Sequence, residues 1–332
     1  MARFQLNRVA KNRSGKGEGL ASLASSGLTP LLCAFLLITN GTLRAQALKL
    51  NHEAEGLTEA RTYIDHGEYA NADKELRSYI AEHPSDVDAQ YLLAFALFRE
   101  NKPADSLNEY TAAARHRPPQ APDLKTVALD YVLLNDYADA EHWIRSALSM
   151  DPNDPEAWYE AGRIEYTLNY FRPALSAFER SLQLDPASVK AENNLGLALE
   201  GLNRTDDAIG AYRKALAMQA ASPHPSEQPF LNLATVLINL NELDEALPLL
   251  KQAAEIAPND WKILAQLGRL YAQQGNLDAA RETLERAVAI EPGKASLHFQ
   301  LGQVYKKAGE LEKAQAEFAT TQKLLGTNSS AQ

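Results

Sequence analysis

The sequence contains a single cysteine, Cys33, among its 332 residues. So few thiols exclude a disulfide framework and leave noncovalent packing to stabilise the fold. Its apolar stretch near the N-terminus, Leu28 to Ile38, has eleven residues and includes Thr29 and Pro30. A helix that crosses a bilayer needs about 20 apolar residues, so this stretch is too short to predict a transmembrane span.

Residue patterns that carry catalysis are also missing. The sequence has no Gly-rich phosphate loop, no GxSxG elbow and no HExxH pair. Its seven histidines do not have the spacing of metal ligands; they stand at positions 52, 66, 83, 116, 142, 224 and 298. We therefore predict a chain that is not an enzyme and that needs no cofactor and no metal.

The N-terminal region has the order of a secretory signal: a basic start, the apolar stretch, and then the small-x-small sequence Ala45-Gln46-Ala47. We predict that residues 1–47 are a signal peptide; a short anchor that is not cleaved is the alternative. The basic start comprises Arg3, Arg8, Lys11, Arg13 and Lys16.

Positive charge is scarce in the rest of the chain. Residues 1–47 hold six Lys or Arg and one Glu, so of the 33 basic and 43 acidic residues the mature chain would keep 27 and 42, a net charge of −15. Binding to nucleic acid requires clustered Lys and Arg that neutralise phosphates. We therefore expect no nucleic-acid partner, and we interpret the acidic charge as a source of solubility.

One stretch, from Pro155 to Ser188, contains two amphipathic segments at helical spacing. Asn169 lies at the turn between them, and Pro173 falls in the opening turn of the second segment, where a missing N–H costs little. The second segment ends at Asp185, because the proline that follows disfavours helix at that residue. The stretch is predicted to be a helix-turn-helix hairpin that cannot bury its apolar face without neighbours.

Copies of this hairpin recur with a period of 34 residues. Prolines at 84, 118, 152 and 186 are each 34 apart, as are those at 258 and 292, and the gap between the two sets is two periods plus four residues. One column of small residues recurs in the first helices: Ala60, Ala94, Ala128, Gly162, Gly196, Ala234, Gly268 and Gly302. A second recurs in the second helices: Ala72, Ser106, Ala140, Ala174, Ala208, Ala246, Ala280 and Ala314. Small side chains there let helices approach to roughly 8–10 Å.

This period and these columns resemble the tetratricopeptide repeat (TPR) family. The resemblance covers about residues 53–326 and implies an all-α fold, a right-handed TPR superhelix (α-solenoid) of about eight helix-turn-helix repeats. We expect a lead-in at 48–52, a polar tail at 327–332, and repeats at 53–86, 87–120, 121–154, 155–188, 189–222, 227–260, 261–294 and 295–326.

The inner face of such a superhelix is lined by the first helices. Two residues before the small position, the last five repeats carry Glu160, Asn194, Asn232, Gln266 and Gln300. This row resembles in part the asparagine ladder of the O-GlcNAc transferase superhelix, which holds extended peptides by their main chain. Two interpretations stay open: a solvated polar row, and a peptide-binding row in which Arg163, Arg269 and Lys306 favour acidic ligand side chains. The carboxylate clamp of chaperone-binding TPR proteins is not expected, because Gln266 stands where its arginine is needed.

The resemblance implies a non-catalytic scaffold that binds a protein or an extended peptide on its concave face. The alternative is a structural component of a cell-envelope assembly or of a polysaccharide or protein export complex. The signal peptide places the mature chain in the periplasm or cell envelope, or outside the cell, with no transmembrane span of its own. A membrane-associated complex stays open as a partner.

Overall fold

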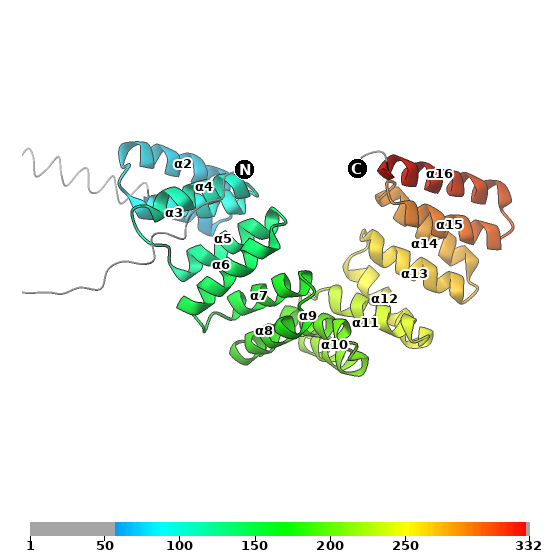
Figure 1. Cartoon of the computed structure of the whole chain (residues 1–332). Coiled ribbons are helices and arrows are strands. Elements are labelled where there is room, and N and C mark those ends of the chain that lie inside the picture. The colour runs from blue at the N-terminus through cyan, green and yellow to red at the C-terminus, as the bar shows by residue number, and fades with distance from the viewer. Residues whose placement is uncertain (1–56, 330–332) are drawn as a thin grey trace, which may run out of the picture. The chain divides into compact units, whose positions relative to one another are not determined.

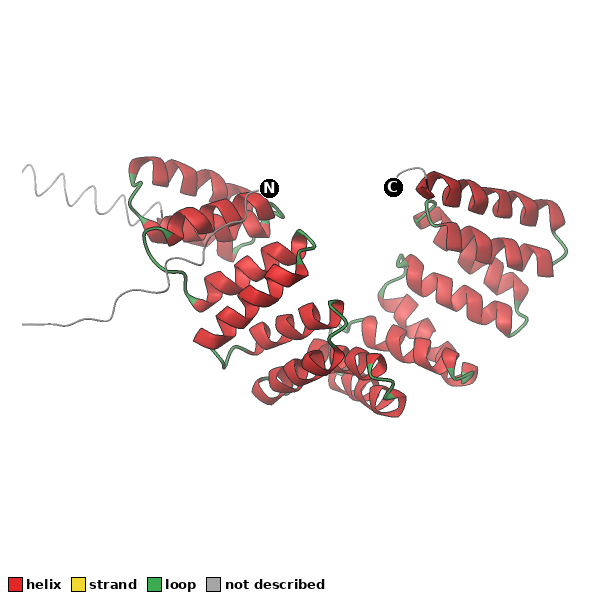
Figure 2. Ribbon diagram, in the orientation of Figure 1, coloured by secondary structure: helices red, strands yellow, loops and turns green. Residues whose placement is uncertain are grey.

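The computed structural model describes residues 57–329, and the regular elements in this range are all α-helices (Figures 1 and 2). Residues 57–65 are helical. The helices that follow are α2 (Tyr69–Glu82), α3 (Val87–Arg99), α4 (Pro103–Ala114), α5 (Ala121–Leu133), α6 (Tyr137–Met150), α7 (Pro155–Thr167), α8 (Phe171–Leu184), α9 (Val189–Gly201), α10 (Thr205–Gln219), α11 (Gln228–Asn239), α12 (Leu243–Ile256), α13 (Trp261–Gln273), α14 (Leu277–Ile290), α15 (Ala295–Lys307) and α16 (Leu311–Ser329). The signal peptide predicted for residues 1–47 and the lead-in at 48–52 lie outside this range.

The helices form antiparallel hairpins. Helix α9 packs against α10, α11 against α12, α13 against α14 and α15 against α16, and the second helix of each pair also contacts the first helix of the next. The chain divides into two compact units, with the division inside α7: residues up to Ile164 belong to the first unit and residues from Glu165 to the second. The predicted all-α repeat fold is confirmed.

The turn inside each hairpin contains one residue in the left-handed conformation. Five are asparagines with φ between 59° and 62°: Asn101, Asn135, Asn169, Asn203 and Asn241. Three are glycines with φ between 76° and 82°: Gly67, Gly275 and Gly309. Asparagine and glycine tolerate this region better than other residues. After Asn203 the backbone N–H of Arg204 donates to the carbonyl of Leu199 (2.9 Å), a Schellman bond that closes α9.

The insertion between α10 and α11 is closed by one side chain. Gln219 is buried, its Nε2 donates to the Ser226 carbonyl (2.8 Å), and its Oε1 accepts from the Ser226 N–H (2.9 Å). Both ends of the extra loop are therefore held together, so the hairpin stack continues after the period is broken.

The large residue of each second helix packs on the small residue of the first. A Cβ added to Gly268 would lie 2.6 Å from Leu284 Cγ, and one added to Gly302 would lie 2.7 Å from the ring of Phe318. Gly196 faces the ring of Tyr212 in the same way, and Tyr212 is fully buried. A methyl group at any of the three sites would therefore require the facing side chain to shift.

The C-terminal helix extends into the predicted polar tail at 327–332, since α16 continues to Ser329. Five of the earlier second helices, α2, α6, α8, α12 and α14, end two residues before a proline, as α14 does before Glu291-Pro292. No proline follows Leu311, so the sequence after residue 326 contains no comparable stop signal.

Enlarging a small residue at a helix crossing should destabilise the stack. Ala208 is fully buried among Tyr212, Leu237 and other core residues of the second unit. We expect Ala208→Leu to lower the free energy of unfolding by about 1–3 kcal/mol through overpacking. Hydrogen exchange should show the largest loss of protection in the adjacent hairpins, because repeats interact with their nearest neighbours.

The matched control, Gly210, lies two residues away in the same helix, on the opposite side. A Cβ at Gly210 would meet no atom within 4 Å, so Gly210→Ala should leave stability unchanged or raise it slightly. Equal stability of Ala208→Leu and wild type would contradict the close crossing.

A buried carboxyl group lies in the first unit. Asp130 of α5 is fully buried, and its Oδ2 lies 2.6 Å from Ser106 Oγ of α4. Ser106 Oγ also lies 2.9 Å from the carbonyl of Ala94, and one hydroxyl proton cannot be donated to both. A protonated Asp130 whose Oδ2 donates to Ser106 leaves the Ser106 hydroxyl free to donate to the Ala94 carbonyl. The other oxygen, Asp130 Oδ1, is buried and has no partner among the described residues. Burial raises the pKa of Asp130 from 3.8 to about 7, and the Ser106 hydrogen bond lowers it by less.

The stability of the first unit should therefore depend on pH. The raised pKa means that the folded state binds the proton more tightly than the unfolded state, so stability falls as pH rises from about 4 to about 7. The total loss should be about 2–4 kcal/mol. Melting temperatures of wild type and Asp130→Asn measured across this range should diverge, because the amide stays neutral. Parallel curves would contradict a protonated Asp130.

Candidate functional site

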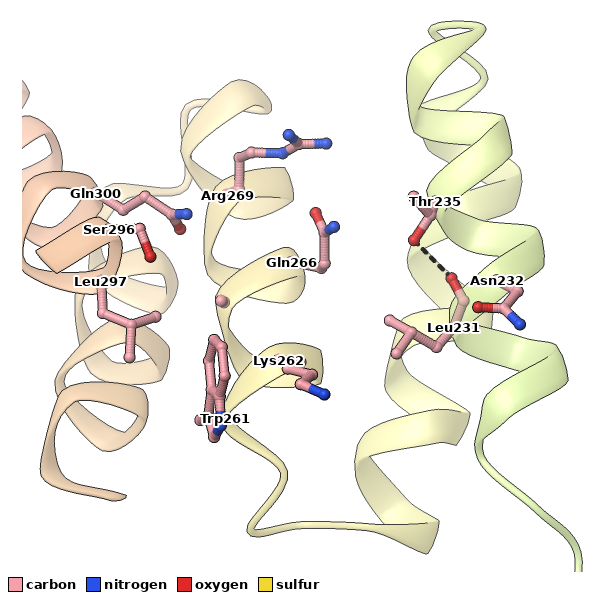
Figure 3. A pocket seen from close by; sticks show the side chains of 11 residues that line it. Leu231, Asn232, Thr235, Trp261, Lys262, Gln266, Arg269, Ser296, Leu297 and Gln300 are labelled. Atoms are coloured by element: carbon pink, nitrogen blue, oxygen red, sulfur yellow. Dashed lines mark hydrogen bonds between the residues drawn. The ribbon is translucent and has the colours of Figure 1, made fainter. Parts of the chain in front are cut away.

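The first helices of the second unit lie in a row. Helix α9 contacts α11, α11 contacts α13, and α13 contacts α15, and Figure 3 shows the last three from close by. Their shared face contains a groove of about 360 Å³. The groove is lined by Leu231, Asn232 and Thr235 of α11, by Trp261, Lys262, Ala265, Gln266 and Arg269 of α13, and by Ser296, Leu297 and Gln300 of α15.

Three residues of the predicted amide row meet in this groove: Asn232, Gln266 and Gln300. Each lies two residues before the small residue that packs on the second helix, and two residues are about 200° around a helix. The amides are therefore turned away from the second helices and toward the groove. All three are half-buried, so each side chain has its position restricted while still reaching solvent.

The fourth member, Asn194 on α9, is joined to the row by a residue that sequence reasoning missed. Asn193 is buried, its Nδ2 donates to Asn194 Oδ1 (3.1 Å), and its Oδ1 accepts from Asn232 Nδ2 (2.9 Å). Part of the hydrogen-bonding capacity of Asn194 and Asn232 is therefore used to link α9 to α11.

Farther along the groove, at Gln300 and Arg269, some hydrogen-bonding capacity is unused. Gln300 Oε1 is buried and, among the described residues, has no hydrogen-bond partner, and the same is true of Arg269 Nε. Buried polar atoms are rarely left without a partner. The part of the groove between α13 and α15 is therefore the part with hydrogen bonds left to make.

The groove is positively charged in an acidic protein. Its two charged lining residues are Lys262 and Arg269, whereas the whole chain has a net charge of −10. Neither forms an ion pair within the part of the chain that the structure describes. In Figure 3, Lys262, Gln266 and Arg269 follow one another along one side of α13. Unneutralised cations beside amides favour an anionic or acidic ligand.

Two predicted site residues lie elsewhere. Arg163 belongs to the first unit, where its Nη1 lies 2.8 Å from Oε2 of the buried Glu160. Lys306 is exposed and is not among the residues that line the groove, and its contribution to a peptide site stays a prediction. Gln300 is six residues earlier in α15, and six residues are 240° around a helix. The lysine near Gln300 is instead Lys307, which lines a smaller adjoining groove with Arg269, Gln300 and Gln303.

The first unit has a groove of another kind, of about 570 Å³. Its lining includes the aromatic residues Tyr91, Phe95 and Tyr110. Arg117 lies over the ring of Tyr91 at 4.6 Å and pairs with Asp88 at 2.8 Å. The amide row has no counterpart there, since Leu92 occupies the equivalent position in α3.

Within residues 57–329, no group of three or more His, Cys, Asp or Glu side chains is arranged to hold a metal ion. The helices in the same range include none that combines the length and the apolar character needed to cross a bilayer.

The fold and this face define a class, the helical-hairpin repeat proteins. Models of the tetratricopeptide repeat match residues 57–122, 128–169, 166–224, 237–295 and 295–320. The chain belongs to the tetratricopeptide repeat family.

Among curated relatives, the peroxisomal targeting signal receptor of Kluyveromyces lactis is 22% identical over 176 residues, which cover 42% of this chain and 31% of the receptor. A DnaJ homolog subfamily C member 7 homolog of Dictyostelium discoideum is 25% identical over 155 residues, 43% of this chain and 29% of that protein. The chain thus spans about a third or less of the length of these relatives.

Solved structures share the fold. A tetratricopeptide repeat protein from Parabacteroides merdae has a TM-score of 0.61 at 16% identity, covering 76% of this chain and 98% of that one. PilW, a type IV pilus biogenesis factor, has a TM-score of 0.55 at 24% identity, covering 61% of this chain and 92% of PilW.

Proposed function

We propose that this chain is a non-catalytic scaffold that binds a protein partner through an extended segment laid along the groove of α11, α13 and α15. The observation that carries the proposal is that Asn232, Gln266 and Gln300, one from each helix, line one groove, and that the buried Oε1 of Gln300 has no partner among the described residues. A carboxamide offers both a donor and an acceptor, as a peptide unit does.

The spacing of the helices fits an extended chain. Neighbouring helices lie roughly 8–10 Å apart, and an extended chain advances about 3.3 Å per residue. One helix therefore corresponds to about three ligand residues. A segment of about six to eight residues would contact all three amides.

The family supports the class of this function. One of the curated relatives is named as a receptor for a peroxisomal targeting signal. The alternative, a structural part of an envelope assembly, differs in one measurable property. A spacer in such an assembly would show no saturable binding of a soluble peptide.

Removing two amides should weaken peptide binding without unfolding the protein. A peptide would be selected from a randomised display library on the immobilised chain, and its affinity measured by fluorescence anisotropy. Gln266→Ala combined with Gln300→Ala removes two hydrogen bonds of about 0.5–1.5 kcal/mol each. The affinity should fall about five- to a hundredfold, with an unchanged melting temperature.

Gln252→Ala is the control, because Gln252 is an exposed amide on the second helix α12. It should leave the affinity unchanged. If the double variant binds the selected peptide as tightly as wild type, the groove is not the site. If no peptide is enriched and none binds saturably, the alternative of a spacer is favoured.

We also propose that the chain is exported and acts in the periplasm, the cell envelope or outside the cell. The support is the basic start, the apolar stretch and Ala45-Gln46-Ala47. Mass spectrometry of the native protein should find an N-terminus at or within a few residues of Leu48. An intact Met1 on the native cytoplasmic protein would contradict export.

A further inference from the structure

The two cations of the groove stand on opposite sides of the central amide. Lys262 is four residues before Gln266 on α13, and Arg269 is three residues after it. Each is therefore about one helical turn, or roughly 5 Å, from Gln266 along the helix axis. Figure 3 shows Lys262 toward the start of α13, Gln266 in the middle and Arg269 toward its end.

An extended segment presents its side chains to both cations in turn. The proposed function requires the amides to hydrogen-bond with the backbone N–H and C=O groups along one edge of the segment. The side chains of the segment then project parallel to the helix axes. Successive residues of an extended chain point to opposite sides. One residue therefore faces Lys262 and the next faces Arg269.

We propose that the bound segment carries two adjacent acidic residues at α13, one opposite Lys262 and the other opposite Arg269. This inference rests on the proposed function and narrows the partner to proteins with an exposed acidic pair in an extended segment. Unlike a general preference for negative charge, it specifies that the two acids are neighbours in the sequence.

The neighbouring helices do not repeat this charge pattern. The positions equivalent to Lys262 and Arg269 are Gln228 and Thr235 on α11, and Ser296 and Gln303 on α15. All four are neutral and polar, so α13 is the one helix of the three with a cation at both positions, and the acidic pair is specified there.

Lys262 has a second cation nearby at the start of α13. The ammonium groups of Lys262 and Lys294 lie 5.8 Å and 5.7 Å from the Trp261 ring centroid. The carboxylate of Asp260 is also at this end, and it accepts from the backbone N–H of Lys262 at 2.7 Å. The negative charge of Asp260 offsets one of the two ammonium charges, so this end keeps one net positive charge for a ligand carboxylate.

The test uses three peptides of about ten residues, long enough to cross the three helices. Each has blocked ends, a background of Ser and Thr, and a central insert: an adjacent Asp-Glu pair, the same two acids separated by one Ser, or Asn-Gln. Fluorescence anisotropy would measure their affinities for the full chain. Separated acids point to one side, so they cannot face Lys262 and Arg269 at the same time.

We expect the adjacent pair to bind about three- to tenfold more tightly than the separated pair, and about ten- to a hundredfold more tightly than Asn-Gln. Lys262→Gln and Arg269→Gln should each reduce the advantage of the adjacent pair, and the double variant should abolish it. Each variant should weaken binding of the Asn-Gln peptide less than it weakens binding of the adjacent pair. Lys251→Gln, which removes an exposed cation of α12, should change none of the three affinities.

Equal affinities for the adjacent and separated acids would overturn the inference, since that is the result of general charge attraction. If all three peptides bind equally and Gln266→Ala with Gln300→Ala weakens them, the acidic-pair inference fails and the proposed function stands. If no peptide binds saturably, the proposed function fails with it.

Discussion

The contact between the large residue of a second helix and the small residue of the first decides how closely the two helices approach. In the second unit Tyr212 lies on Gly196, Leu284 on Gly268 and Phe318 on Gly302, with no room for a Cβ at any of the three glycines. Packing this close fixes the rotation of each first helix about its axis. Every other position on that helix then has a defined direction.

The groove follows from this constraint. Residues two places before the small column are turned away from the second helix, so the amides of successive repeats meet on one face without a local signal of their own. The cations follow the same rule, since Lys262 and Arg269 lie one turn on either side of Gln266 on α13. The period that builds the fold also aligns the polar side chains that could hold a partner.

The fold and the family could be predicted from the sequence because they depend on what is repeated. The 34-residue period and the columns of small residues are visible in the sequence without any coordinates. What could not be predicted depends on single residues of one copy. Asn193 precedes the amide column by one place, and only the packing of α9 on α11 shows that its side chain joins Asn194 to Asn232.

Asp130 did leave a signal in the sequence. Equivalent positions of the following repeats hold Ile164, Ala198, Val236, Leu270 and Val304, so a carboxyl group in this apolar column is an outlier. Ser106 was counted only as a small residue, yet its hydroxyl is what Asp130 contacts.

The most direct test of the account is a crystal structure of the chain with a peptide selected from a randomised library. The account predicts an extended peptide across α11, α13 and α15, with its main chain within hydrogen-bonding distance of the side chains of Gln266 and Gln300. A peptide bound in the aromatic groove of the first unit, or on the second helices, would contradict it.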